Sequence, residues 1–427
     1  MKVLLVGGGG REHALAWKIA QSPLVEKIWC APGNPGIAAY AECLPIQADA
    51  LDPLVDFARD HAIDLAVIGP EAPLTLGLTD RLQALGIPVF GPTQNAARLE
   101  GSKAFMKDLL ARHGIPTAPY RTFRDPEAAL SYLQTQEIPI VVKTSGLAAG
   151  KGAIVCLSRE EAREAVERIM IRREFGSAGD ETVVEGFLRG EEASLLAFVD
   201  GERVIPLAGA QDHKAIWDGD AGPNTGGMGA YSPAPALTET LVKRAIDTLV
   251  LPTVRAMAQE GSPYRGILYA GLMIDGDDLQ ILEYNVRFGD PECQPLLMRM
   301  RSDIIPFLMA CATGSLEGMQ IDWDPRAALC VVMAAKGYPG SYPKGDAIRG
   351  LDEAATHSDT MVFHAGTRLD HDQVVTAGGR VLGVTALGHG VAEAQRRAYE
   401  AVRAISWDGV QFRNDIGYRA VAREQQP

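Results

Sequence analysis

The first ninety residues alternate short apolar runs with segments of helix length, and this alternation restricts the fold more than any other feature of the sequence. The apolar runs cover residues 3–6, 27–30, 65–68 and 89–90. Strands that alternate with helices form parallel sheets that carry helices on both faces. The sequence therefore predicts an α/β protein that begins with a doubly wound parallel sheet.

Glycine-rich or polar loops follow three of the predicted strands, at residues 7–10, 31–34 and 69–71. In a parallel sheet the carboxyl ends of the strands share one edge, and ligands bind beyond that edge. Residues 7–10 also open a predicted helix, whose free backbone N–H groups attract an anion. We therefore expect a phosphate site at this loop, although a tight strand-to-helix turn would also explain the glycines.

A dinucleotide-binding domain is a weaker interpretation of the same sheet. The fingerprint G-x-G-x-x-G needs a third glycine where Glu12 or His13 stands. The loop after the second strand, residues 31–34, also lacks the acid that holds a ribose. A nicotinamide-dependent oxidoreductase is thus a rival hypothesis that the sequence does not favour.

The chain has 427 residues, which is too long for one ordinary hydrophobic core. The helix breakers Gly114, Pro116 and Pro119 follow a predicted helix at 102–112 and indicate a boundary nearby. We predict an amino-terminal substrate-binding domain, a central region with a mobile α+β lobe, and a small carboxyl-terminal α/β domain. Their predicted ranges are residues 1–101, 102–326 (the lobe at about 120–192) and 327–427.

Composition excludes several classes of protein. The formal charge of -13 opposes non-specific binding to nucleic acid or to anionic membranes. The six cysteines form no C-x-x-C pair, so we expect reduced thiols rather than a structural zinc site. The longest fully apolar run, residues 327–335, is too short to span a bilayer, and the amino terminus lacks a signal-like segment. We therefore expect a cytoplasmic enzyme without nucleic-acid or membrane partners.

The sequence GLAAGKG at residues 146–152 lies between two predicted strands. Small residues there would allow backbone amides and Lys151 to surround a polyphosphate. The segment is not a Walker A motif, because Gly152 stands where Ser or Thr would hold Mg²⁺. Lys143 ends the preceding apolar strand and could reach the same phosphate, unless it is simply a solvent-exposed lysine.

One acid and a glycine interrupt an apolar run at residues 183–188. This pattern is compatible with a hinge between two lobes, whose backbone could bind the edge of an adenine ring. Glu191 and Glu192 follow, and either could accept hydrogen bonds from ribose hydroxyls. A solvated acidic pair explains these two residues equally well.

The strongest local indication of a metal site is Glu283, Asn285 and Arg287, which end an apolar strand. Alternation along a strand places the three side chains on one face. Carboxylate and amide oxygens suit Mg²⁺, and an arginine can hold a carboxylate with two hydrogen bonds. A buried ion pair is the alternative role for this arginine. Asp290 and Glu292 place further acids near the site without a defined role.

Residues 208–235 are rich in Gly, Asp, Asn and Pro and are predicted to form one long functional loop. Within it, Asp212, His213 and Lys214 could meet a second substrate, together with the free backbone groups of residues 224–229. His213 is more simply an ordinary loop histidine than a base. No serine–histidine–aspartate triad is indicated.

Taken together, these segments resemble the ATP-grasp ligases. The specific parts of the resemblance are QDHK, GPNTGGMGAYSP and RFGDPE, and the similarity runs from residue 1 to about residue 420. Among ATP-grasp ligases the chain is most similar to those of purine biosynthesis that join glycine to 5-phosphoribosylamine. The resemblance implies ATP-grasp α+β lobes in the central region, with ATP lying between them.

The resemblance also implies roles for individual residues. It implies nucleotide binding by Lys103, Lys143, Gly150, Lys151, Glu185, Gly186, Phe187 and Glu192. It implies catalytic roles for Lys143, Lys151, Asp212, Lys214 and Arg287, and binding of Mg²⁺ or Mn²⁺ by Glu283 and Asn285. It implies substrate contacts for Gly8, Gly9, Gly10, Asn34, Pro35, Gly36, Asp212, Lys214, Arg287 and Asp290.

The implied reaction phosphorylates glycine with ATP, and the amine of 5-phosphoribosylamine then displaces phosphate from glycyl phosphate. The products are glycinamide ribonucleotide, ADP and phosphate, and the enzyme is expected to act as a monomer. Two rivals remain besides the oxidoreductase: a related ligase such as a carboxylase, and a nucleotide sensor without catalytic activity.

Overall fold

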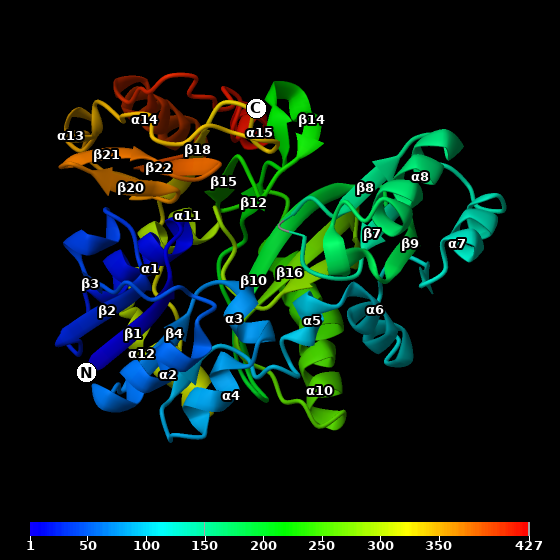
Figure 1. The fold of residues 1–427 in the computed structure, drawn as a ribbon, viewed down its shortest axis with the longest axis horizontal. Coiled ribbons are helices and arrows are strands. Elements are labelled where there is room, and N and C mark those ends of the chain that lie inside the picture. Colours follow the sequence, from blue (N-terminus) through cyan, green and yellow to red (C-terminus); the bar gives the residue numbers. More distant parts are fainter. Residues whose placement is uncertain (149, 426–427) are drawn as a thin grey trace.

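The computed structural model describes residues 1–148 and 150–425, so one residue of the predicted loop 146–152 and the end of the predicted carboxyl-terminal domain lie outside it. Figure 1 shows the amino-terminal sheet beneath the carboxyl-terminal sheet on one side of the molecule, and a small lobe at the opposite end. The long strands β10 (Glu191–Asp200) and β16 (Arg265–Asp275) lie between these parts.

The amino-terminal sheet has the strand order β3-β2-β1-β4-β5, and its pairings are parallel. Leu4 and Val6 of β1 pack on one side of the sheet, whereas Val3 and Leu5 pack on the other. The predicted doubly wound parallel sheet is therefore confirmed. The strands are β1 (Lys2–Gly7), β2 (Lys27–Pro32), β3 (Glu42–Cys43), β4 (Leu65–Ile68) and β5 (Val89–Phe90), and the helices are α1 (Gly10–Ile19), α2 (Leu51–Asp60), α3 (Glu71–Thr75) and α4 (Leu78–Gln83).

The central region contains an antiparallel sheet in the order β11-β10-β16-β17. Ser102 begins α6 as its N-cap, because its hydroxyl accepts a hydrogen bond from the Phe105 amide at 3.2 Å. The strands are β10 (Glu191–Asp200), β11 (Val204–Pro206), β16 (Arg265–Asp275) and β17 (Asp278–Asn285). The helices are α5 (Arg98–Gly101), α6 (Lys103–Arg112), α9 (Glu239–Ala245), α10 (Leu251–Gln259), α11 (Cys293–Arg299) and α12 (Ile304–Thr313).

The small lobe is a second antiparallel sheet, in the order β6-β9-β7-β8. It has its own hydrophobic core, in which Phe123, Val142 and Val184 are buried. A separate core of this kind allows a lobe to move as a unit. Its elements are β6 (Tyr120–Phe123), α7 (Pro126–Leu133), β7 (Ile140–Thr144), β8 (Ala153–Cys156), α8 (Arg159–Val166) and β9 (Thr182–Gly186).

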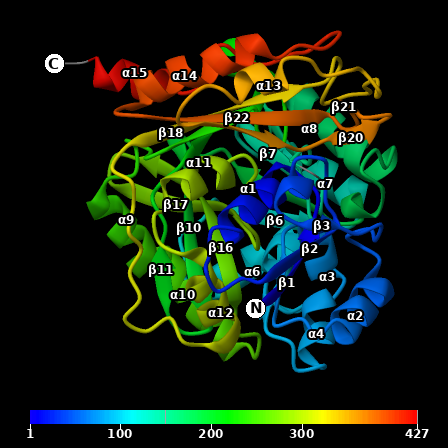
Figure 2. The ribbon, with the colours of Figure 1, turned by 90° about the vertical axis from the view of Figure 1, so that its left-hand side faces the viewer.

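The carboxyl-terminal sheet has the order β12-β15-β18-β22-β19. Figure 2 shows α14 covering its outer face, with α1 and α11 beneath it. Its strands are β12 (Gln211–Asp212), β15 (Gly229–Ser232), β18 (Ala327–Ala334), β19 (Thr360–His364) and β22 (Arg380–Gly388). The other elements are β13 (Ala215–Trp217), β14 (Ala221–Asn224), α13 (Leu351–Ala354), β20 (Thr367–Asp370), β21 (Gln373–Thr376), α14 (Val391–Ala404) and α15 (Tyr418–Glu424).

The prediction of one long loop at 208–235 is wrong. This segment forms β12, β13, β14 and β15, and β15 pairs with β18 of the carboxyl-terminal sheet. The four strands are short and rich in glycine and polar residues, so they carry no local strand pattern. Their pairing depends on a partner far along the chain, which a local pattern cannot reveal.

Two further expectations concern the whole chain. All six cysteines are free thiols, as expected. Across the described residues, no helix combines the length and the hydropathy that a membrane span requires.

Candidate functional site

The glycine loop after β1 faces side chains of the central region. The Gly9 amide donates to Glu12 Oε2 at 2.7 Å. A Cβ atom placed on Gly10 would lie 2.7 Å from Gln294 Nε2 and 3.5 Å from Asp290 Oδ1. The start of α1 therefore meets two carboxylates. The predicted phosphate site at residues 7–10 stays a prediction. Arg11 and Arg380 pair with the two carboxylates there and offset their charge.

Asn34 holds this loop in place. Its Nδ2 donates to the Gly8 and His364 carbonyl oxygens, both at 2.9 Å, and its Oδ1 accepts from the amides of Gly36 and Ile37. Each polar atom of the amide thus has two protein partners. Pro35 lies within the same turn. The predicted substrate contacts of Asn34, Pro35 and Gly36 stay predictions, and the observed bonds give Asn34 a positioning role.

A buried carboxylate in the small lobe pairs with two lysines. Glu185 forms ion pairs with Lys143 and, at 2.5 Å, with Lys107. Lys143 also donates to the Leu282 carbonyl oxygen of β17 at 3.3 Å, which links the lobe to the central sheet. Burial alone would raise the pKa of Glu185, but the two ammonium groups lower it below its ordinary value. Glu185 therefore orients Lys143 toward the centre of the molecule.

Gly186 and Phe187, which follow Glu185, were predicted to contact adenine. The Gly186 amide already donates to the Pro119 carbonyl oxygen at 2.8 Å, and the Phe187 side chain is exposed. An exposed aromatic ring beside a strand end can cover one face of a base. The adenine contact itself stays a prediction.

Lysine side chains from several elements lower the pKa of Glu283. Lys214 Nζ lies 3.8 Å from Glu283 Oε1. Burial would raise the pKa of Glu283, but Lys214, Lys143 and Lys103 together lower it to about 2. The carboxylate is therefore ionised at neutral pH. The predicted catalytic residue Lys214 pairs with this carboxylate, and the predicted nucleotide-binding residues Lys103 and Lys143 contribute to its lowered pKa.

The two acids that begin β10 have different partners. Glu192 pairs with Lys214, which also faces Glu283. Glu191 instead pairs with Arg423 of α15 and accepts from Gln211 Nε2 at 3.0 Å. Glu192 thus lies in the lysine-rich group, and Glu191 connects β10 to the carboxyl-terminal domain. This arrangement favours Glu192 for the predicted ribose contact.

Lys151 and Gly150 lie at a different place from this group. Lys151 Nζ donates to the Pro339 carbonyl oxygen at 2.6 Å and lies 5.7 Å from the Tyr338 ring centroid. Gly150 has φ +76°, and a Cβ atom there would lie 2.8 Å from the Thr225 carbonyl oxygen. The glycine loop of the small lobe therefore rests on the carboxyl-terminal side of the molecule.

Arg287 joins three parts of the chain. Its guanidinium donates to Glu71 Oε2 at 3.2 Å, to Glu100 Oε1 at 2.8 Å and to Asn285 Oδ1 at 3.1 Å. A fourth bond reaches the Phe288 carbonyl oxygen at 3.2 Å. Four of the five N–H groups of the arginine are thus engaged. The ion pair that was the alternative role for Arg287 is present, and its role as a carboxylate clamp stays a prediction.

Asp212 and Glu292 form a second acidic group. Glu292 Oε1 accepts from the Tyr269 hydroxyl at 2.6 Å and from Ser194 Oγ at 3.2 Å. Burial, together with Glu292, raises the pKa of Asp212 well above its ordinary value, although Lys214 opposes the shift. This geometry gives Glu292 defined partners that the sequence did not indicate.

His213 has a structural partner. Its Nε2 accepts from the Gly417 amide at 3.1 Å, and burial lowers the pKa of His213 to about 4. The neutral ring therefore connects the loop after β12 to α15. This supports its interpretation as an ordinary loop histidine.

Sequence reasoning missed Lys107 and Glu100, and it placed Glu71 at the ligand-binding edge of the first sheet without a role. Lys107 lies within α6 among apolar residues and is fully buried. A lysine on the apolar face of a helix is a sign of a buried charge partner. Glu71 and Glu100 lie in the short helices α3 and α5, whose sequences do not indicate a buried charge partner.

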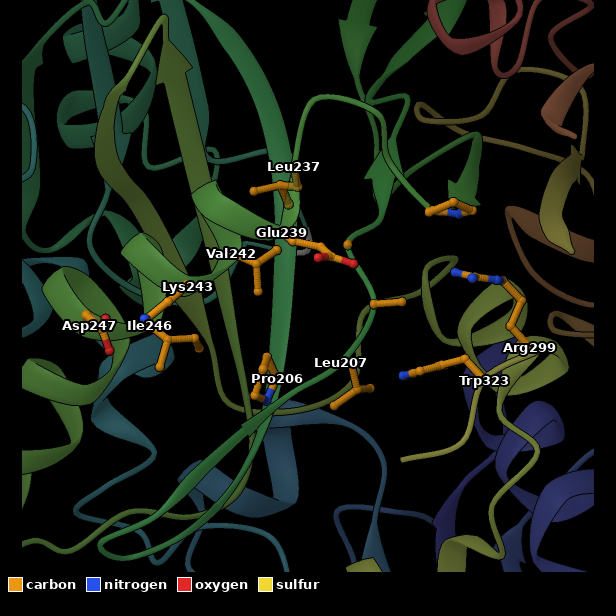
Figure 3. A pocket seen from close by; sticks show the side chains of 13 residues that line it. Pro206, Leu207, Leu237, Glu239, Val242, Lys243, Ile246, Asp247, Arg299 and Trp323 are labelled. Atoms are coloured by element: carbon orange, nitrogen blue, oxygen red, sulfur yellow. The ribbon is translucent and has the colours of Figure 1, made fainter. Parts of the chain in front are cut away.

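Figure 3 shows a cavity of about 520 Å³ between α9 and the segment around Trp323. None of the predicted site residues lines it. Arg299 reaches this cavity but donates to Ser232 Oγ and to the Arg326 carbonyl oxygen, both at 2.7 Å. These bonds explain the buried arginine as a link between chain segments.

Comparison with known proteins adds to this geometry. The family models described as phosphoribosylglycinamide synthetase N domain, ATP-grasp (A) domain and C domain match residues 1–100, 101–293 and 328–419. The chain is 56% identical over 424 residues to a phosphoribosylamine–glycine ligase of Rhizobium meliloti (strain 1021), covering 99% of this chain and 100% of that protein. It is 55% identical over 429 residues to the ligase of Vibrio vulnificus (strain YJ016), covering 100% of both.

Solved structures are also similar. A phosphoribosylamine–glycine ligase from Thermotoga maritima superposes with a TM-score of 0.84 at 32% identity, covering 97% of this chain and 100% of that chain. The biotin carboxylase domain of a Hydrogenobacter thermophilus 2-oxoglutarate carboxylase gives a TM-score of 0.73 at 18% identity, covering 96% and 91%. The second likeness concerns the fold alone.

Proposed function

The chain belongs to the family of phosphoribosylamine–glycine ligases, and from this premise we propose that it uses ATP to join glycine to 5-phosphoribosylamine. The product is glycinamide ribonucleotide, formed in purine biosynthesis. The observation that carries the proposal is the ion pair of Lys214 with Glu283 at 3.8 Å, beside Lys143, which donates to the Leu282 carbonyl oxygen of the same strand. We propose that the lysines bind the phosphates of ATP beside this carboxylate.

Two chemical steps lead to the product. An oxygen of the glycine carboxylate attacks the γ-phosphorus of ATP, the bond to the bridging oxygen breaks, and ADP leaves. The amine nitrogen of phosphoribosylamine then attacks the acyl carbon of glycyl phosphate, phosphate leaves, and the amine loses a proton to solvent. Phosphoryl transfer of this kind needs positioning and positive charge rather than a protein nucleophile.

The residues present fit a divalent cation. Glu283 and Asn285 offer a carboxylate and an amide oxygen from one face of β17, and Asn285 Oδ1 is oriented by Arg287. Within residues 1–148 and 150–425, no group of three His, Cys, Asp or Glu side chains could hold a metal by itself. Two oxygen ligands from protein suit Mg²⁺ when nucleotide phosphates complete its shell, and Mn²⁺ accepts the same ligands. When bound, the cation would neutralise charge on the transferred phosphoryl group.

The remaining predicted residues have places in this scheme. We propose that Arg287 holds the glycine carboxylate and that Asp212 and Lys214 contact the reacting groups. The contact of Lys151 with Pro339 supports a closed small lobe, which would keep water from glycyl phosphate. We propose that the protein is a monomer and that it works in the cytoplasm.

Release of ADP tests the proposed function. We expect ADP release to require glycine, 5-phosphoribosylamine and Mg²⁺ together, and Mn²⁺ to substitute for Mg²⁺. Phosphoribosylamine is formed in the assay from ribose 5-phosphate and ammonia. Release that requires bicarbonate instead of glycine would identify a carboxylase, and nucleotide binding without release would identify a sensor.

Arg287→Lys tests the proposed clamp. A lysine offers a point charge in place of the planar fork, so the KM for glycine is expected to rise about 10- to 100-fold. The KM for ATP should change less than about threefold, because the lysines that bind phosphate are unchanged. Steady-state kinetics with each substrate varied provide the measurement. An unchanged KM for glycine would reject the clamp. Arg287 would then serve only in its ion pairs with Glu71 and Glu100.

A further inference from the structure

A buried amide oxygen beside the glycine loop has no partner. Gln294, in the first turn of α11, is 1% exposed. Its Nε2 donates to Asp290 Oδ1 at 2.9 Å, and this bond fixes which end of the amide faces the carboxylate. Gln294 Oε1 then accepts no hydrogen bond from any residue that the structure describes. An unsatisfied buried acceptor costs stability, so its presence requires an explanation.

Three parts of the chain meet at this amide. A Cβ atom on Gly10 would lie 2.7 Å from Gln294 Nε2 and 3.6 Å from the Ala365 Cβ. A Cβ atom on Gly383 of β22 would lie 3.6 Å from the same nitrogen. The glycine loop of the first sheet, α11 and the carboxyl-terminal domain therefore enclose the Gln294 amide.

The charges around the amide compensate one another. Asp290 lies 3.5 Å from Arg380, and Glu12 lies 2.7 Å from Arg11. Burial would raise the pKa of Asp290, but Arg380 and Arg11 lower it, so the carboxylate is ionised at neutral pH.

The two arginines are already hydrogen-bonded to the protein. Arg11 donates to the Phe288 carbonyl oxygen at 2.9 Å, and Arg380 donates to the Gly226 carbonyl oxygen at 2.7 Å. Arg11 and Arg380 offset the charges of Glu12 and Asp290, and Gln294 Oε1 is the buried acceptor that has no partner among the described residues. Such a place suits a neutral donor. A phosphate would face the carboxylates, and an ammonium group would add an uncompensated charge.

A neutral donor of this kind is present in the amine substrate of the proposed function, on which this inference rests. We propose that Gln294 Oε1 and Asp290 bind a hydroxyl of the ribosyl ring and so select ribosyl amines over deoxyribosyl amines. The phosphate of the substrate then meets donors elsewhere than the start of α1. Sites that hydrogen-bond a substrate hydroxyl reject analogues without it, because the buried acceptor stays unpaired.

Gln294→Met tests this inference, because methionine keeps the length of the side chain and removes the amide, both its unpaired oxygen and its hydrogen bond to Asp290. The rate constant kcat/KM is measured with amines formed from ribose 5-phosphate, 2-deoxyribose 5-phosphate and 3-deoxyribose 5-phosphate. The wild type is expected to disfavour one of the deoxy amines about 10- to 100-fold. In Gln294→Met this preference should fall to less than about threefold, through loss of activity on the ribosyl amine. The KM values for glycine and ATP should stay within about twofold.

Gln395→Met is the matched control. Gln395 lies in α14 and donates to the Ile416 carbonyl oxygen at 2.8 Å, remote from the glycine loop. It should keep the wild-type preference, and thermal melting of both variants checks the fold.

Several results would overturn the inference. Unchanged discrimination in a folded Gln294→Met variant would mean that Oε1 only holds water. A selective rise in the KM for glycine would assign the amide to the glycine ammonium group. If the variant does not fold, the kcat/KM values of the wild type still test the inference. Equal values for all three amines would exclude a contact with a ribosyl hydroxyl. A wild type that does not use the ribosyl amine at all would reject the proposed function itself.

Discussion

Glu283→Gln is expected to lower kcat by about 100- to 1000-fold while the protein still folds. The substitution keeps the shape of the side chain and removes the carboxylate on which the lysines converge. A metal ligand and a negative charge are lost at the point where phosphoryl transfer is proposed. The fold should persist because the nearby lysines keep other partners, Lys214 with Glu192 and Lys143 with Glu185.

The measurement is steady-state kcat with all substrates saturating, followed by a titration with Mg²⁺. The variant should need a higher Mg²⁺ concentration for half-maximal ADP binding, because one protein ligand is missing. Glu260→Gln serves as a control, since Glu260 forms an exposed ion pair with Arg112. A kcat near the wild-type value in Glu283→Gln would reject the assignment of Glu283 to the metal.

The regular elements of the fold were predictable because their patterns are local. The apolar strand predicted before Asn285 is β17 (Asp278–Asn285), and the helix predicted at 102–112 is α6 (Lys103–Arg112), with Ser102 as its cap. The alternation that placed Asn285 and Arg287 on one face agrees with the 3.1 Å hydrogen bond between them. The spacing of apolar residues and the capping of a helix each depend on a few neighbouring residues. Both can therefore be recognised in the sequence alone.

The partners within the site were not predictable, because they are distant in sequence. Arg287 bonds Glu71 and Glu100, and Lys107 bonds Glu185. No local pattern joins such residues. The prediction of a loop at residues 208–235 is wrong for the same reason. Strand β15 forms by pairing with β18, which lies far along the chain.

The glycine loop at residues 7–10 shows a second limit. A helix start after glycines predicts an anion site, and that rule considers only the backbone. In the folded chain Glu12 and Asp290 bring carboxylates to the same helix start. A rule that considers only the backbone does not include these carboxylates or the arginines Arg11 and Arg380 that pair with them, so it cannot decide which ligand the loop prefers.

Glu185→Ala is expected to lower the free energy of unfolding by about 3–5 kcal/mol at neutral pH. The substitution leaves the ammonium groups of Lys107 and Lys143 buried without their shared carboxylate. Removal of one partner from a buried ion pair leaves a desolvated charge, which costs far more than the loss of an exposed pair. Urea unfolding at pH 7 provides the measurement. Glu260→Ala, which breaks an exposed pair, should cost only about 0–1 kcal/mol.

The same variant has a predicted dependence on pH. The pKa of Glu185 is lower in the folded chain than in the unfolded chain, so its stabilising effect is present above the unfolded pKa of about 4.3. That effect is lost as the pH falls through the folded pKa, and the difference between wild type and Glu185→Ala should narrow in acid. Adding Lys107→Met to Glu185→Ala should recover part of the loss, because one of the two uncompensated charges disappears. A loss below about 1 kcal/mol at pH 7 would mean that both lysines turn to solvent, and the double variant would then be no more stable than the single one.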